Sequence, residues 1–263
     1  MSLLLYGIFR NKKGKQPGLP AGVEGERVFV LYRNGLAAAA SRVSSSDLSI
    51  RVDDVIAYGN VIDALYRSRT VIPVQYGSLL GEESDITRLL EKCGRQYESL
   101  LNEIEDCAEM GIRVLLPKRD VRGFGNGETT ARSSASPGRE YLFNRREHYV
   151  REGLMDGGHH VPVKRYQDAF AGLFRKCRHE IMPVSRELSG DERQLLSLQF
   201  LIKRENIGAF QSAFQHLQRL EAVKMLMSGP WPPYSFVTTE SGRVRDILER
   251  GWGQRLSSLK LFR

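Results

Sequence analysis

The sequence is poor in cysteine, and its cysteines and histidines are not spaced as metal ligands. The three cysteines, Cys93, Cys107 and Cys177, form no C-x-x-C pair, and an odd number of thiols is typical of a reducing compartment. The five histidines form no H-E-x-x-H motif and have no ligand spacing with cysteine. We therefore expect a cytoplasmic protein with no metal site and no cofactor.

Motifs that mark common enzyme classes are also missing. No G-x-S-x-G sequence is present to bring a serine nucleophile to a base. The glycine-rich stretch 123–127 lacks the Lys-Ser/Thr pair of a phosphate-binding loop. Active sites also assemble from distant positions, so an enzyme or ligand-binding protein stays open as the alternative. Because no residue stands out as catalytic, we expect no enzyme.

Long hydrophobic runs and blocks of one charge are absent as well. No apolar run approaches the length of a membrane-spanning helix, and Met1–Tyr6 carries neither a basic leader nor a cleavage motif. The net charge of +8 would suit nucleic acid, an anionic surface or an acidic protein. The basic residues are scattered and not interleaved with aromatics, so we expect neither nucleic acid nor a lipid membrane as partner.

What the first half of the chain does contain is a set of short apolar runs. Residues 2–9, 28–32 and 36–43 are expected strands, and the last two are joined by Asn34-Gly35, which favours a tight hairpin turn. Apolar residues at helical spacing predict a helix over 52–66. These elements indicate a sheet with a helix packed on it.

Two further elements follow in the first half. Residues 70–77 are β-branched and apolar, but Pro73 places this strand at a sheet edge or bend. A long amphipathic helix is predicted from an N-cap at Ser84 through Cys107. Cys93 and Cys107 lie on its apolar stripe, where we interpret them as small core residues.

The second half alternates between strands and helices around a polar stretch. Residues 119–138 are rich in Gly, Ser, Thr and Arg and are expected to form a flexible insertion. The other predicted elements are a strand at 112–116, a helix at 140–151, a helix from Val163 to near Pro183, a strand at 195–202, a helix capped by Asn206, and a strand at 223–227.

This order of elements predicts an α+β protein with two domains. The strands are few and the helices could lie on one face of each sheet, which favours two α+β sandwiches over a doubly wound sheet. We expect an N-terminal domain over 1–108 and a C-terminal domain over 109–238 with a split β-α-β arrangement of ferredoxin type. Residues 239–263 form a basic tail.

One stretch, Gly229–Phe236, combines three prolines with three aromatic residues. Proline fixes φ and lacks a backbone donor, so we expect this arm to be stiff, extended and polyproline-like. Such an arm could close the fold by laying its aromatic side chains over the core, or it could present a surface to a partner. The residues themselves leave both uses open.

The arm also resembles the closing signature of the gas vesicle protein family GvpL/GvpF. Other stretches resemble segments of that family in the same order, from residue 3 to residue 237. They are Leu5-Tyr6-Gly7-Ile8, Val71–Gly77, Gly138–Leu142 and Phe200-Leu201-Ile202. The insertion at 119–138 and the tail after 238 depart from the pattern, and no family role extends to them.

The resemblance implies a non-enzymatic accessory protein of gas vesicles, located in the cytoplasm and at the vesicle. Family members are two-domain α+β proteins thought to bind the small hydrophobic shell protein and other accessory proteins during vesicle nucleation, as assembly factors or minor structural components. A soluble partner would shield an aggregation-prone shell subunit. We assign contact with the partner to the edge strand and the arm, at Pro73, Gln75, Tyr76, Trp231, Pro232, Pro233, Tyr234 and Phe236.

Overall fold

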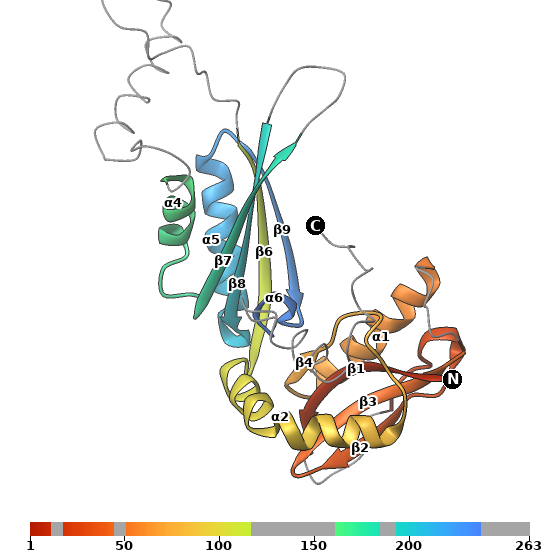
Figure 1. The fold of residues 1–263 in the computed structure, drawn as a ribbon. Helices are drawn as coiled ribbons and strands as arrows, with labels where there is room; N and C mark the ends of the chain where they lie inside the picture. Colours follow the sequence, from red (N-terminus) through yellow and green to blue (C-terminus); the bar gives the residue numbers. More distant parts are fainter. Residues whose placement is uncertain (12–17, 45–50, 117–160, 185–192, 238–263) are drawn as a thin grey trace, which may run out of the picture. The chain divides into compact units, whose positions relative to one another are not determined.

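The computed structural model describes residues 1–11, 18–44, 51–116, 161–184 and 193–237, which form a mixed α+β fold with two antiparallel sheets (Figure 1). The chain divides into two compact units. The first comprises Met1–Met110, Leu201–Arg204 and Gly229–Arg263, and the second comprises Gly111–Phe200 and Glu205–Ser228. The chain therefore passes between the units several times, and the first unit includes segments from three parts of the sequence.

The sheet of the first unit is built around its first strand. The strand order is β2 (Phe29–Arg33), β3 (Leu36–Val43), β1 (Ser2–Arg10) and β4 (Val71–Pro73), and the short β5 (Leu79–Leu80) also pairs with β1. Strand β1 is buried along nearly its whole length, as its unbroken apolar run predicts. Strand β4 lies at the edge of the sheet, where its proline needs no ladder donor.

A two-residue turn sets the register of the β2–β3 hairpin. Asn34 and Gly35 have φ values of 48° and 80°, which is the left-handed pair that the predicted tight turn requires. Arg33 is therefore paired with Leu36, and the ladder continues to Phe29 and Ala40. The sequence prediction of this hairpin is confirmed.

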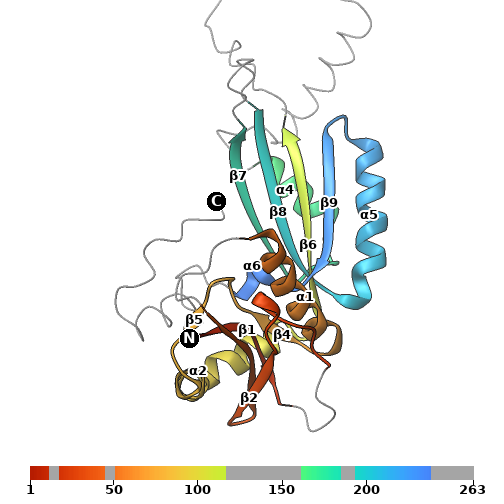
Figure 2. The same cartoon turned by 90° about the vertical axis from the view of Figure 1, so that its right-hand side faces the viewer.

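Helices cover both faces of this sheet. The helix α1 (Val52–Ser68) contacts β1 and β4 on the face that carries Tyr6, and a short 3-10 turn η1 (Val23–Gly25) lies beside it. The helix α2 (Glu83–Glu103) packs on the opposite face, over β1, β2 and β3 (Figure 2). Each helix buries one apolar stripe against the sheet.

The ends of α2 differ from the prediction. Glu82, not Ser84, is the N-cap, and it forms a capping box with Asp85 that satisfies two backbone donors. The helix ends at Glu103, and Cys107 begins strand β6 (Cys107–Leu116) instead of lying on the helical stripe. Cys93 and Cys107 are both buried free thiols, as core residues should be.

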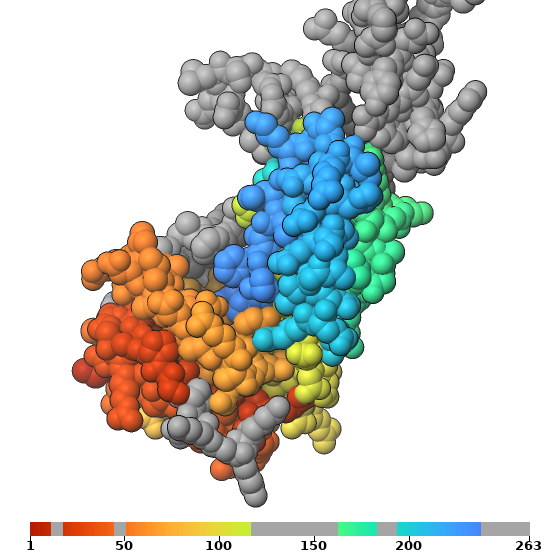
Figure 3. All heavy atoms as spheres, turned by 180° about the vertical axis from the view of Figure 1, so that it is seen from behind, coloured from red at the N-terminus to blue at the C-terminus, as the bar shows by residue number. Residues whose placement is uncertain are grey.

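The second sheet has the order β7 (Lys176–Val184), β8 (Arg193–Lys203), β6 and β9 (Lys224–Trp231). The helices α4 (Val161–Ala169) and α5 (Ile207–Leu220) lie side by side on one face of it (Figure 3). Phe170, Phe200 and Phe210 join these elements, because the Phe170 ring stacks on Phe210 at 4.3 Å and both meet Phe200 at 5.3 Å.

One prediction in this region is wrong and another holds in part. The helix expected from Val163 to Pro183 is α4 followed by strand β7, because Gly172 adopts a left-handed φ of 79° that breaks the helix. Asn206 is the N-cap residue of α5, as predicted, but its side chain forms no capping hydrogen bond and donates instead to the Leu173 carbonyl at 3.4 Å. The predicted insertion at 119–138, the helix at 140–151 and the basic tail at 239–263 lie outside the described residues.

Candidate interaction site

The first half of the predicted site is the segment that follows β4. Pro73 is buried and paired with Gly7 of β1, while Gln75 is exposed and Tyr76 is half-buried. The Ser78 amide donates to the Gln75 carbonyl at 3.2 Å, and Gly77 supplies the positive φ of 86° that this turn needs at its third residue. The turn presents Gln75 to solvent.

A stack of tyrosines supports this turn from beneath. The Tyr76 ring meets Tyr58 of α1 edge-on at 5.2 Å, and Tyr58 stacks on Tyr6 of β1 at 4.8 Å. The Tyr58 hydroxyl lies 2.7 Å from the Val74 carbonyl and 2.9 Å from the Leu5 carbonyl. Burial raises the pKa of Tyr58 well above its ordinary value. The segment after β4 is thereby tied to both the sheet and α1.

The second half of the predicted site is the arm, and its course differs from the extended chain that its prolines suggested. Strand β9 continues through Pro230 to Trp231 at the edge of the second sheet, where a missing donor is tolerated. Pro232 and Pro233 then turn the chain into α6 (Tyr234–Val237), a single helical turn. The expectation of a polyproline-like arm is therefore wrong after Trp231.

A buried carboxylate holds this helical turn in place. Glu109 of β6 is only 8% exposed, and its two oxygens accept hydrogen bonds from the backbone amide and the hydroxyl of Ser235, each at 2.7 Å. A carboxylate at the start of a helix is favoured by the free backbone donors there. Gly229 lies against the same strand, and a Cβ on it would come within 2.6 Å of the Glu109 carbonyl oxygen.

The arm and the strand edge come together in the structure. The turn α6 contacts β4, and Phe236 and Val237 belong to the same buried core as Ile72 and Val74. Pro232, Pro233 and Phe236 are buried with Pro73, so in this state they stabilise the fold. The exposed residues of the predicted site are Gln75, Trp231 and Tyr234, of which Trp231 is 49% and Tyr234 is 39% exposed, and Tyr76 is half-buried.

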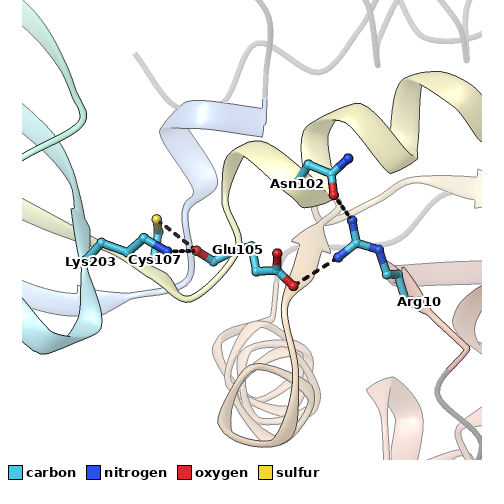
Figure 4. A network of polar contacts seen from close by, with 5 residues as sticks. All are labelled: Arg10, Asn102, Glu105, Cys107 and Lys203. Carbon is cyan, nitrogen blue, oxygen red and sulfur yellow. Dashed lines mark hydrogen bonds and ion pairs between the residues drawn. The ribbon is translucent and has the colours of Figure 1, made fainter.

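A polar network organises the rest of the first unit near the start of β6. Arg10 of β1 bonds the side chains of Asn102 and Glu105, and the Glu105 carbonyl accepts a hydrogen bond from the Lys203 ammonium at 3.0 Å (Figure 4). Cys107 contacts the same carbonyl with its Sγ at 3.3 Å. The turn between α2 and β6 is thus bound to β1 and to the end of β8.

Arg204 continues this anchoring one residue after Lys203. Its guanidinium lies over the Tyr66 ring at 4.0 Å and donates to the Tyr66 carbonyl at 2.7 Å, and its backbone amide donates to the Asp106 carbonyl at 3.0 Å. Neither Arg204 nor Glu109 is predicted as part of the site from the sequence. Their partners are distant in the sequence, so no local pattern marks them.

The described residues contain no group of three or more His, Cys, Asp or Glu side chains arranged to hold a metal ion. In the part of the chain that the structure describes, none of the helices is both long enough and apolar enough to span a membrane. The exposed side chains of the predicted site are two aromatic groups and one amide, Trp231, Tyr234 and Gln75.

Comparison with known proteins identifies the family. The family model for "Gas vesicle synthesis protein GvpL/GvpF" matches residues 2–238. The chain belongs to the GvpL/GvpF family. It is therefore a gas vesicle protein by family, as its sequence motifs predict.

Curated relatives and solved structures agree with this membership. Gas vesicle protein F1 of Halobacterium salinarum is 24% identical over 92% of this chain and 95% of its own length. Gas vesicle protein L of a Streptomyces species is 25% identical over 94% of this chain and 97% of its own length. The fold is similar to the crystal structure of GvpF from Anabaena, with a TM-score of 0.62, 17% identity and coverage of 90% and 96%. The Microcystis aeruginosa GvpF structure gives the same TM-score, at 15% identity and coverage of 90% and 99%.

Proposed function

We propose that this GvpL/GvpF protein is a non-enzymatic assembly factor that binds the hydrophobic gas vesicle shell protein and other accessory proteins during vesicle nucleation. It would act in the cytoplasm and at the vesicle, as a transient factor or as a minor component. Family membership supports the gas vesicle role, and one structural observation supports the binding role. Two large aromatic side chains, Trp231 and Tyr234, are exposed on a segment that is fixed to the core.

The physical argument for binding is pre-organisation. Aromatic side chains supply much of the binding energy at protein interfaces, and holding them in place beforehand reduces the entropy lost on binding. Trp231 and Tyr234 flank two buried prolines, and the Glu109–Ser235 hydrogen bonds and the buried Phe236 fix the turn that carries Tyr234. An apolar shell subunit would gain contact area on these side chains at a low ordering cost.

The proposed partner surface consists of Gln75, Trp231 and Tyr234, with Tyr76 at its base. The buried members of the predicted site, Pro73, Pro232, Pro233 and Phe236, would act by positioning these groups. Tyr76 follows β4 in the chain, and the turn α6 that carries Tyr234 contacts β4. This proximity supports one continuous surface in the first unit.

We also propose that the second unit is a ferredoxin-like domain within the limits 109–238. Its elements follow the order β6, α4, β7, β8, α5 and β9, with a strand order of β7-β8-β6-β9 and both helices on one face. This is the order of a split β-α-β arrangement, and it supports the proposal.

A pull-down with the shell protein encoded in the same operon tests the binding proposal. Trp231→Ala combined with Tyr234→Ala should lower the retained shell protein by tenfold or more while the far-UV circular dichroism and melting temperature stay near those of the parent. The matched control is Leu226→Ala, which removes another exposed apolar side chain, one that belongs to the second unit. Equal retention by all three proteins would exclude the aromatic pair as the binding surface.

A further inference from the structure

The two edge strands of the first sheet, β4 and β2, have different surroundings. At the β4 edge the turn α6 contacts the strand and buries Phe236 against its residues, which is a standard way to cover an edge. At the opposite edge, β2 pairs only with β3 among the residues that the structure describes. Among the described residues, one edge of this sheet is therefore covered and the other is unpaired.

The hairpin turn determines which backbone groups of β2 face the open side. In a two-residue hairpin the residues that flank the turn exchange both hydrogen bonds, and here these are Arg33 and Leu36. Hydrogen bonding alternates along an antiparallel pair, so Leu31 and Phe29 also point their amides and carbonyls toward β3. The amides and carbonyls of Val30 and Tyr32 point away from β3, toward the open side.

Strand β2 lacks the features that usually block such an edge. It contains no proline, lysine or bulge, and its single charge, Arg33, forms an ion pair with Glu91 of α2. Phe29 and Leu31 pack partly against the core on the α2 side, while Tyr32 on the other side is 42% exposed. The edge is straight, largely apolar and able to accept another extended strand.

We propose that this edge binds β2 of a second copy of the chain, antiparallel and centred on Leu31. This register pairs all five residues of one β2 with all five of the other: Leu31 with Leu31, Val30 with Tyr32, and Phe29 with Arg33. Val30 and Tyr32, whose backbone groups face outward, become hydrogen-bonded partners, and Leu31 meets its copy at the closely spaced non-hydrogen-bonded position. The interface is two-fold symmetric and self-complementary.

Side-chain chemistry selects this register among the alternatives. It gives two aromatic–β-branched pairs, Tyr32 with Val30, on one face, and two arginine–aromatic pairs, Arg33 with Phe29, on the other. If the centre of pairing shifts toward the start of the strand, Arg27 lies opposite Arg33 of the other copy, and the two positive charges repel each other. If the centre shifts toward the turn, Asn34 takes the place of a strand residue in the pairing, so fewer residues of β2 are paired. Only the register centred on Leu31 pairs the whole strand without opposing like charges.

The dimer should be weak, because a five-residue strand pair buries less surface than a standard stable interface. Analytical ultracentrifugation of the full chain should show a concentration-dependent monomer–dimer equilibrium. Tyr32→Pro removes an outward-facing amide, which an edge strand tolerates, and should raise the dimer dissociation constant about tenfold or more while leaving the melting temperature nearly unchanged. A parent protein that is monomeric at every concentration would overturn the proposal.

A charge exchange tests the register itself. Val30→Lys with Tyr32→Lys sets two lysines opposite each other across the interface and should abolish the dimer. Val30→Glu with Tyr32→Lys sets opposite charges there and should restore it. Both double variants place charged side chains on the same two edge positions, so a loss caused by altered folding would affect both. If both double variants keep the melting temperature of the parent and are monomeric, the register is overturned.

Cross-linking gives a second, independent readout. Leu31→Cys would bring two thiols together across the two-fold axis, where Cα atoms at non-hydrogen-bonded positions lie about 4.5 Å apart, within the range of a disulfide. Oxidation should then give a covalent dimer. Val30→Cys is the control, because its copies are not opposite each other in this register. Covalent dimers from Val30→Cys and none from Leu31→Cys would contradict the assigned pairing.

Discussion

The Glu109 carboxylate accepts two hydrogen bonds from Ser235, a residue 126 positions later in the chain. Glu109 is buried at the start of β6, and Ser235 belongs to the helical turn that covers the β4 edge. Two charge-assisted bonds at 2.7 Å thus fasten the end of the described chain to the first unit.

Removing the carboxylate should destabilise the first unit. Glu109→Ala is expected to lower the free energy of unfolding by about 2–3 kcal/mol, because hydrogen bonds to charged groups contribute about that much and the Ser235 donors would lose their acceptor. Ser235→Ala should cost less, about 1 kcal/mol, since its amide can still bond the carboxylate. Urea denaturation measures both values.

The control for this pair is Glu98→Ala, which removes an exposed glutamate from α2. Its effect should stay within about 0.5 kcal/mol, as is usual for surface substitutions. If Glu109→Ala also falls within that range, the Glu109–Ser235 bonds contribute little to the stability of the fold.

The arm should divide into residues that hold the fold and residues that face a partner. Phe236→Ala removes a side chain that is 4% exposed in the core and should cost about 3–5 kcal/mol of stability. Trp231→Ala, at a side chain that is 49% exposed, should cost far less, below about 1 kcal/mol. Thermal unfolding of the two variants measures the difference, and an equal loss for both would mean that Trp231 also belongs to the core.

Local patterns were enough to predict much of the fold. Asn34-Gly35 fixed the hairpin because only left-handed residues close a two-residue turn, and the apolar spacing from Ile86 to Leu101 marked α2 because one helical face is buried. The edge position of β4 followed from Pro73 alone. In each case the physical constraint acts within a few residues of the chain.

Contacts between distant residues could not be predicted in this way. The apolar spacing around Cys177 predicts a helix, but this residue belongs to strand β7. That strand gains its ladder bonds from β8, which the spacing does not reveal. The course of the arm after Trp231 depends on Glu109. In the sequence this residue cannot be distinguished from a surface glutamate, and only the structure shows that it is buried. The division of the predicted site into buried and exposed residues depends on contacts between distant parts of the chain, so it required the coordinates.

Gly229 should be irreplaceable in the arm. It adopts a φ of 106°, and an added Cβ would lie 2.6 Å from the Glu109 carbonyl oxygen. Gly229→Ala should therefore destabilise the protein by more than about 1 kcal/mol, because both the backbone conformation and the close approach oppose a side chain. Gly208→Ala in α5, where nothing lies within 4 Å of the added atom, should instead stabilise by up to about 1 kcal/mol. Melting temperatures that move in the same direction for both variants would contradict this assignment.

The buried tyrosines of the first unit should make its stability fall at high pH. Burial raises the pKa of Tyr58 and Tyr97 well above the ordinary value, and partial burial raises the pKa of Tyr234 to about 12. In the unfolded chain these hydroxyls ionise near pH 10, so above that pH the unfolded state binds fewer protons than the folded state. The tyrosines' contribution to stability is fully present below about pH 10 and decreases as the pH rises toward 12 and beyond.

Urea denaturation at pH 8, 10 and 11 measures this decrease in the free energy of unfolding. Tyr97→Phe removes one of these groups and should make the free energy of unfolding fall less steeply with pH. An unchanged slope in that variant would show that Tyr97 does not contribute.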